Sequence, residues 1–547
     1  MTKKRISPTI AFLLVLALMF CLQLWKASRG MGSSDEHFYI SLGWRLEQGD
    51  GLFADDWHIA QMISVFLYPL VHLYRLLFHS NTGIVLGFRV FYILFTSLVG
   101  TAVFSRYRSH GYRAVAAAAL YMAFTPFNIQ ALSYNTMGPG FLILSFLLID
   151  RQGKDRVRSI ISGLVFSWAV LCTPYLALLY VAMVIVSLVR PSAVSRRCAG
   201  FFTLGVVIAA GLFLVFVFSR ADLSSVVYGL RHLIDPSHTT SLAVQIYKNF
   251  GRLYYGFGPL VVSMPVCLIL SVLFRKKGEA EKKKLLAVSF GFTVLSILWL
   301  LLISRYQLEV GGFTVILVPA AIFFLNKMIL FGTSFDVSAA MFLSIAYSIA
   351  LFLSSNVGPR SFAGPLIIGI AFSALDLKPD ERADEVLYGL IIAVLILFKI
   401  INVYGGYSDF SVRIDEGPMA GLYDSSENVS GYEHRLSDIV FINRQTDCDY
   451  AYLITSNTWE YLALEKRIAA NSTYMYFWEE DEYTACMDDY ISSHPDRYPA
   501  YVYLDTENPY SMTSSDPWLS GGPVLKELSA GELRLQLSGV DNQSVVK

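Results

Sequence analysis

The sequence predicts a polytopic α-helical membrane protein with about 13 transmembrane helices and an extracytoplasmic α/β domain at its C-terminus. Of the 547 residues, 54% are hydrophobic and only 16% are charged, whereas about 25% of residues are charged in soluble domains. Many apolar segments reach the roughly 20 residues that cross a bilayer. Residues 409–547 contain 9 Lys+Arg and 24 Asp+Glu, a net charge of −15, and residues 1–408 carry +15.

The first expected helix follows Lys3, Lys4 and Arg5 and runs from Ile10 to Trp25. Basic residues before an apolar segment are also typical of a signal peptide, but no small-residue cleavage site follows, so we predict a retained helix. Further spans are predicted at residues 87–105, 114–128, 135–150, 159–174, 175–190, 200–219, 255–274, 285–304, 310–329, 335–353, 363–377 and 386–403.

Basic residues recur in alternate connections between these spans. They lie at residues 106–113, 151–158, 196–197, 275–284 and 378–382. Because Lys and Arg accumulate in cytoplasmic loops, this pattern predicts a cytoplasmic N-terminus in a multi-pass cell-membrane protein. An odd number of spans then places the acidic C-terminal segment outside the cytoplasm. The charge is no evidence for a nucleic-acid partner.

We expect a transmembrane domain at residues 1–408 and a soluble α/β domain at residues 409–547. In the soluble domain, apolar clusters at 451–455 and 501–504 predict strands, and the patterns at 458–467 and 481–492 predict helices. Outside the cytoplasm, Cys448 and Cys486 could form a disulfide or remain reduced.

The first predicted outer loop, residues 26–86, concentrates ionisable groups between apolar segments. The sequence Ser34–Tyr39 contains Asp35 and Glu36, and Ala54–His58 contains two further carboxylates. Ionisable groups near hydrocarbon are costly and often functional. Apolar residues at 38–46 and 59–78 predict interfacial helices in the same loop.

These carboxylates have structural and catalytic interpretations. Ser33 and Glu36 fit a capping box, Asp35 suits the positive end of the same helix, and Asp55 or Asp56 could cap the next one. Alternatively, Asp35 is a general base that takes the proton of an acceptor hydroxyl as it attacks the anomeric carbon of a donor sugar. A leaving phosphate has a low pKa, so cations and helix N-termini suffice to stabilise its charge.

The loop presents the Asp35–Glu36 pair, then Tyr39, a glycine-rich turn at 49–51 and the Asp55–Asp56 cluster. In this layout it resembles the membrane glycosyltransferases of the GT-C superfamily, and among them the lipid A aminoarabinose transferases and the protein O-mannosyltransferases. The match covers the first 150 residues best and the rest only in architecture. The resemblance implies an inverting, metal-independent transfer from a polyprenyl-phosphate sugar donor to an envelope glycan, lipid or protein.

By this resemblance, Asp35 takes the place of the family's catalytic carboxylate, with Glu36 beside it. Tyr39, Asp55, Asp56 and His58 become candidates for substrate binding. The last three could instead bind a divalent cation, although two adjacent carboxylates and a histidine are common on protein surfaces.

The sequence departs from the family pattern in two places. Residues 57–61 stand where many relatives carry a Pro-Pro-Leu run, and Asn135 stands where many carry an Asp. The identity of the acceptor therefore does not transfer. Tyr134 and Asn135 could hydrogen-bond a sugar or merely close a helical turn.

The donor phosphate needs cations at the outer ends of helices. Arg305 with Tyr306, and Arg360, are the candidates, because a guanidinium can bind phosphate oxygens bidentately. Arg305 and Arg360 could instead reach lipid headgroups. Lys248 and Arg252 are further candidates in the loop at 220–254.

The alternative function is a transporter or flippase of lipid-linked sugars. Such proteins usually place polar sites at the bilayer midplane on broken, repeated helices. The sequence contains neither internal repeats nor charged residues central to the predicted spans, which favours the transferase.

Overall fold

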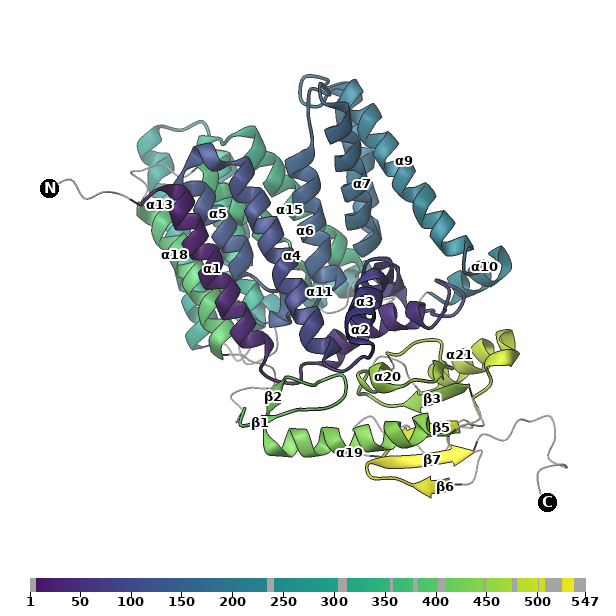
Figure 1. Cartoon of the computed structure of the whole chain (residues 1–547). Helices are drawn as coiled ribbons and strands as arrows, with labels where there is room; N and C mark the ends of the chain where they lie inside the picture. Colours follow the sequence, from purple (N-terminus) through teal and green to yellow (C-terminus); the bar gives the residue numbers. More distant parts are fainter. Residues whose placement is uncertain are drawn as a thin grey trace, which may run out of the picture. The chain divides into compact units, whose positions relative to one another are not determined.

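The computed structural model describes residues 6–233, 241–303, 312–354, 358–376, 382–401, 410–445, 449–474, 480–499, 501–506 and 524–535. The chain forms two compact units, each assembled from segments that are distant in sequence (Figure 1). Unit 1 comprises Met1–Lys26, Tyr92–Leu212 and Thr240–Val403. Unit 2 comprises Ala27–Phe91, Phe213–Thr239 and Tyr404–Lys547.

Unit 1 is built from helices. They are α1 (Pro8–Ala27), most of α4 (Ile84–Arg106), α5 (Tyr112–Ala123), α6 (Tyr134–Leu148), α7 (Arg156–Cys172), α8 (Ala177–Val189), most of α9 (Arg196–Phe218), α11 (Leu242–Phe257), α12 (Ser263–Phe274), α13 (Glu279–Leu302), α14 (Leu317–Phe331), α15 (Phe335–Ser354), α16 (Pro359–Phe362), α17 (Leu366–Ser373) and α18 (Arg382–Ile401). Short 3₁₀ turns connect them at Arg108–His110, Pro126–Asn128, Pro174–Leu176, Gly258–Val262, Gly312–Ile316 and Ala374–Asp376.

The protein is a helical membrane protein. Within the described residues, 8 helical segments are long and apolar enough to cross a bilayer: Pro8–Ala27, Ile59–Phe78, Ile84–Arg106, Arg196–Phe218, Leu242–Phe274, Glu279–Leu302, Phe313–Phe331 and Phe335–Leu353. One of them, Ile59–Phe78, is the segment for which the sequence predicts an interfacial helix. Several predicted spans correspond to shorter helices, such as the 12-residue α5. The predicted number of 13 therefore stays a prediction.

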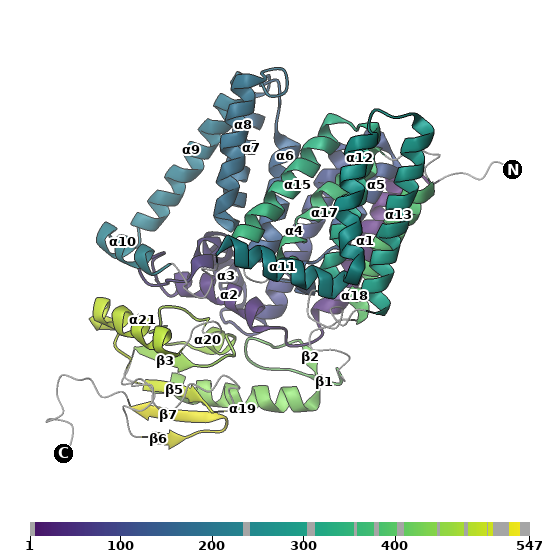
Figure 2. The same cartoon turned by 180° about the vertical axis from the view of Figure 1, so that it is seen from behind.

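The apolar segment Leu242–Phe274 is bent. Gly258 has φ +57° and precedes a proline, so α11 ends there and α12 begins five residues later. Figure 2 shows α11 running crosswise to α12 and α13. Tyr247 and Phe250 on α11 are exposed, whereas Asn249 is buried. An outward apolar face of this kind is typical of a helix that lies along a membrane surface.

Glycines allow α7 and α9 to pack with their backbones in contact. A Cβ added to Gly163 would lie 2.0 Å from the carbonyl oxygen of Phe202, and one added to Gly205 would lie 2.0 Å from that of Ile160. Small residues at such crossings let membrane helices approach closely.

Unit 2 combines helices with a five-stranded mixed sheet. Its elements are α2 (Ser34–Glu47), the 3₁₀ turn η1 (Ile59–Ile63), α3 (Ser64–Phe78), α10 (Leu223–His232), β1 (Val412–Arg413), β2 (Tyr423–Asp424), α19 (Ser426–Asn443), β3 (Tyr450–Ile454), α20 (Glu460–Ala463), β4 (Arg467–Ile468), α21 (Glu480–Ser493), the 3₁₀ turn η10 (Pro495–Arg497), β5 (Tyr501–Asp505), β6 (Val524–Glu527) and β7 (Gly531–Leu535). The strand order is β4-β3-β5-β7-β6, as Figure 1 shows for the last four. Strands β4 and β5 run parallel to β3, and β7 is antiparallel to β5 and β6.

The local predictions for this region are mostly confirmed. The predicted strands at 451–455 and 501–504 are β3 and β5, and the predicted helix at 481–492 is α21. The helix predicted at 458–467 is wrong in length, because only Glu460–Ala463 is helical. The chain extends after Ala463 so that Leu464 and Ile468 are buried and Arg467 pairs with Tyr450 in the sheet.

Backbone hydrogen bonds join the first loop to the C-terminal segment within unit 2. Tyr423 accepts a bond from Gly30 N at 2.8 Å and donates one to Ser28 O at 2.8 Å. Further along, Trp57 N donates to Asn471 O at 2.8 Å. These bonds satisfy backbone groups of both segments, which belong to the same unit.

Candidate functional site

The first turn of α2 holds Asp35 at the point where the loop after β3 reaches the helix. Ser34 Oγ donates to Ser456 O at 2.8 Å, and Thr458 Oγ1 donates to Ser34 O at 2.6 Å. Ser456 and Thr458 follow the carboxyl end of β3 directly. These two side chain–backbone bonds fix the start of α2 against the sheet.

The segment after β4 supplies the partner of Asp35. The Tyr474 hydroxyl donates to Asp35 Oδ1 at 2.5 Å, and the neighbouring Thr473 hydroxyl bonds Ser41 Oγ at 2.6 Å. Strands β3 and β4 are adjacent and parallel, so their carboxyl ends meet at one sheet edge, where open α/β sheets commonly place functional groups. The fold therefore brings Tyr474 to the carboxylate from 439 positions away in the sequence.

Asp35 is half-buried beside aromatic rings. The Phe38 ring lies 4.8 Å from the Tyr474 ring and 4.4 Å from the His58 ring, measured between centroids. Burial raises the pKa of the Asp35 carboxyl, and the hydrogen bond from Tyr474 opposes that increase. A carboxylate with a raised pKa and partial exposure can accept a proton from a bound hydroxyl.

Glu36 points away to a buried ion pair. Its two carboxylate oxygens lie 2.7 Å and 2.9 Å from Arg89 Nε and Nη2. Arg89 also donates to Ala27 O at 2.7 Å and Gly30 O at 3.0 Å, and both charged side chains are almost fully buried. Ser33 is the N-cap residue but makes no side-chain capping bond, so the capping-box prediction is wrong. We assign Glu36 a structural role instead of the predicted catalytic one.

Asp50 and Asp55 belong to a buried charged network that ties the loop to η10. Arg497 lies 2.8 Å from Asp50 Oδ1 and 2.9 Å from Asp55 Oδ1, and Arg45 Nε lies 2.7 Å from Asp50 Oδ2. Burial alone would raise the pKa of Asp55. The hydrogen bond from His494 and the charge of Arg497 outweigh that effect and hold the pKa below its usual value.

Asp56 lies in the same network but is poorly satisfied. Its Oδ1 atom accepts a hydrogen bond from His58 N at 2.8 Å. Its Oδ2 atom lies 3.5 Å from Arg45 Nη1, and among the described residues neither Asp56 Oδ2 nor Arg45 Nη1 has a hydrogen-bond partner. Burial raises the pKa of Asp56 to about 6, although Arg45 opposes this. His58 caps η1, because its Nδ1 accepts from Ala60 N at 3.0 Å.

These contacts leave the cation alternative at Asp55, Asp56 and His58 without support. Asp55 faces Arg497 and His494, and Asp56 faces Arg45. Among the residues that the structure describes, no group of three or more His, Cys, Asp or Glu could hold a metal ion.

The remaining residues that the sequence suggested for substrate binding or a disulfide lie on different elements or outside the described residues. Tyr39 is buried on α2 of unit 2. Tyr134 and Asn135 begin α6 of unit 1, where Ser133 and Thr136 form the capping box. Arg305 and Tyr306 lie outside the described residues, as does Cys448, while Cys486 is a free, buried thiol that accepts a hydrogen bond from Asn471.

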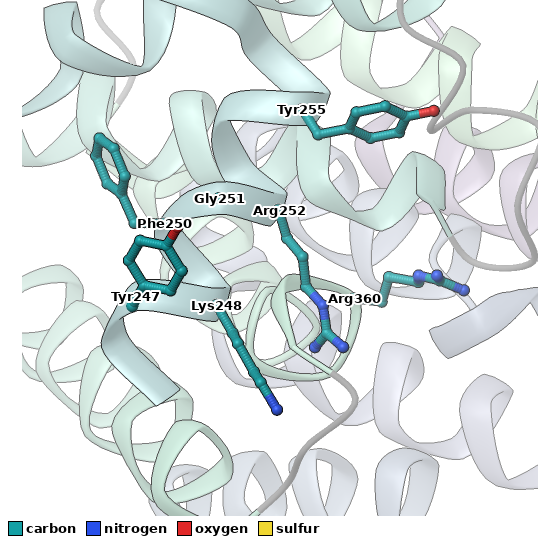
Figure 3. Close-up of a pocket in the computed structure, with 7 residues that line it drawn as sticks. All are labelled: Tyr247, Lys248, Phe250, Gly251, Arg252, Tyr255 and Arg360. Carbon is teal, nitrogen blue, oxygen red and sulfur yellow. The ribbon is translucent and has the colours of Figure 1, made fainter. Parts of the chain in front are cut away.

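Unit 1 contains a basic cavity of about 420 Å³. Lys248 and Arg252 reach it from successive turns of α11, and Arg360 reaches it from α16 (Figure 3). The remaining lining residues are Tyr247, Phe250, Gly251 and Tyr255. Gly358 has φ +87°, and a Cβ there would lie 2.4 Å from Arg252 Nη1. Three cations that the sequence suggested thus line one cavity, although the Arg360 guanidinium points away from the Lys248 and Arg252 side chains in Figure 3.

Fold and site define a helical membrane protein that carries a carboxylate site in one unit and a basic cavity in the other. The sequence matches no protein-family model and no curated protein. The resemblance to glycosyltransferases therefore remains an expectation that rests on the residues of the first loop.

Proposed function

We propose that this protein is a GT-C-type membrane glycosyltransferase that uses a polyprenyl-phosphate sugar donor, with Asp35 as its general base. One observation carries the proposal. The first loop contains six acidic residues, and Asp35 is the one that makes no ion pair within the described part of the chain. Its carboxylate is half-buried, accepts a hydrogen bond on one oxygen and has no arginine as an ion-pair partner among the residues that the structure describes. These are the properties of a base that accepts a proton from a neutral hydroxyl.

The proposed reaction is a single inverting displacement. The acceptor oxygen forms a bond to the anomeric carbon of the sugar while its proton passes to Asp35. The bond between that carbon and the donor phosphate oxygen breaks, and the electron pair leaves with the polyprenyl phosphate. Charge-assisted hydrogen bonds from cations would stabilise the negative charge of the leaving group. Lys248, Arg252 and Arg360 of unit 1 are candidates for binding the phosphate of the donor. The acceptor is an envelope glycan, lipid or protein.

The proposal includes the predicted topology of 13 spans, with the N-terminus in the cytoplasm and residues 409–547 outside. The net charge of −15 on these residues supports it, as does the recurrence of basic residues in alternate connections. Transfer would then occur on the outer face, where polyprenyl-phosphate sugars are the donors that this class of enzyme uses.

The test is sugar release from a panel of radiolabelled polyprenyl-phosphate sugars by the purified full-length protein in detergent. We expect turnover of at least one donor by the wild type and its loss in Asp35→Asn. The matched control is Glu47→Gln, which changes a carboxylate on the same helix that pairs with His72. Absence of turnover, together with passage of lipid-linked sugar across vesicles containing the protein, would identify a transporter instead.

A further inference from the structure

Within its described residues, the C-terminal segment contributes one polar atom directly to Asp35. That atom is the Tyr474 hydroxyl, which donates to Asp35 Oδ1 at 2.5 Å. We propose that Tyr474 is a positioning residue that orients the Asp35 carboxylate and leaves its second oxygen for the acceptor hydroxyl. This role rests on the proposed glycosyl transfer, and it makes the segment after β4 a part of the reaction site.

The position of the Tyr474 hydroxyl is determined by contacts on each side of the residue. Tyr474 is buried, and its backbone N–H donates to Ser472 Oγ at 3.0 Å. The adjacent Thr473 hydroxyl bonds Ser41 Oγ on α2, where both residues are buried. The phenol ring packs edge-on against His58, with centroids 5.9 Å apart. The ring therefore has little freedom to turn the hydroxyl away from Asp35.

The hydrogen bond also sets the proton affinity of the carboxylate. A donor that bonds the ionised form of an acid lowers its pKa, and burial raises it. Within the described residues, the Tyr474 bond is the one interaction that lowers the pKa of Asp35. The titratable side chains next to Asp35 along the chain have other hydrogen-bond partners. Glu36 binds Arg89, and His37 Nε2 lies 2.8 Å from Met31 O. His58 accepts from Ala60 N.

Removal of the hydroxyl alone tests this role. Tyr474→Phe keeps the ring contacts, so we expect the folded structure to persist while the pKa of Asp35 rises, because the hydrogen bond that lowers it is lost. Because Asp35 must be ionised to act as base, the acid limb of the kcat profile should move to higher pH by about the same amount. The KM for the donor should remain unchanged.

The matched control is Thr473→Val, which deletes the neighbouring hydrogen bond between the same segment and α2. A merely structural role for Tyr474 predicts lower stability in both variants and the same kcat profile in both. A shift of the acid limb in Tyr474→Phe alone supports positioning, whereas profiles that coincide in the two variants overturn it.

A second readout does not require turnover. The pKa of Asp35 can be measured by infrared difference spectroscopy of its carboxyl stretch in the full-length protein, with Asp35→Asn as the blank. A higher pKa in Tyr474→Phe than in Thr473→Val supports the proposal, and equal values contradict it. If no donor is turned over, the proposed glycosyl transfer fails, and the infrared measurement still decides whether Tyr474 acts on Asp35.

Discussion

The ion pair between Glu36 and Arg89 predicts that Glu36→Gln destabilises unit 2. The two oxygens of Glu36 lie 2.7 Å and 2.9 Å from the guanidinium, and the side chains are 1% and 0% exposed. Breaking a buried pair by changing one partner costs about 3–5 kcal/mol, because the other charge is left without compensation. Glutamine retains one acceptor oxygen, so we expect about 3 kcal/mol.

This loss is measurable as a melting temperature in detergent. For compact units of 150–250 residues, about 3 kcal/mol corresponds to a decrease of about 6–12 °C. The double variant Glu36→Gln/Arg89→Met removes both charges and should be more stable than Glu36→Gln alone. Glu47→Gln, which affects a more exposed pair, should change stability by less than about 1 kcal/mol.

Activity separates the structural role of Glu36 from a catalytic one. If Glu36 only supports the fold, sugar transfer by the double variant should recover together with its melting temperature. A Glu36→Gln protein that melts like the wild type but does not transfer sugar would refute the structural assignment.

Three further predictions concern the cavity, the charged network and a helix crossing. Lys248→Gln and Arg252→Gln should each raise the donor KM about 10- to 100-fold through loss of a charge-assisted bond, and an unchanged KM would exclude them from the donor site. Burial raises the pKa of Asp56 to about 6, so the folded state holds this proton more tightly than the unfolded state and loses stability as pH rises from about 4 to 6. Asp56→Asn lacks this titration, so its melting temperature minus that of the wild type should increase from about pH 4 to about pH 6. A difference that does not change with pH would contradict the raised pKa of Asp56. Gly163→Val would place side-chain atoms against Phe202 O and should lower thermal stability clearly, while a melting curve like that of the wild type would show that α7 and α9 can separate at little cost.

The class of fold was predictable because it depends on composition. Long apolar segments and sparse charge indicate membrane helices regardless of tertiary detail. The number of spans was harder to predict, because apolar residues also form helices that are too short to cross a bilayer or that lie along its surface. Helix α6, with 15 residues, is apolar but shorter than a span, and α11 runs crosswise although it is continuous with α12 in hydropathy.

The carboxylates of the first loop were predictable as a group, but their individual roles were not. Those roles are decided by partners that lie far away in the sequence, such as Arg497 for Asp55 and Tyr474 for Asp35. No local pattern connects these pairs, because the sheet brings them together only after folding. Arg89 carried a usable signal, since a charged residue in an apolar helix is costly and usually has a specific partner.

The most direct test of the central claim compares wild type and Asp35→Asn in donor turnover and donor binding. A positioned general base contributes about 10²- to 10⁴-fold to the rate, so kcat should fall by that factor in the variant while its affinity for the polyprenyl-phosphate sugar is retained. Full turnover by Asp35→Asn would contradict the assignment of Asp35 as the base.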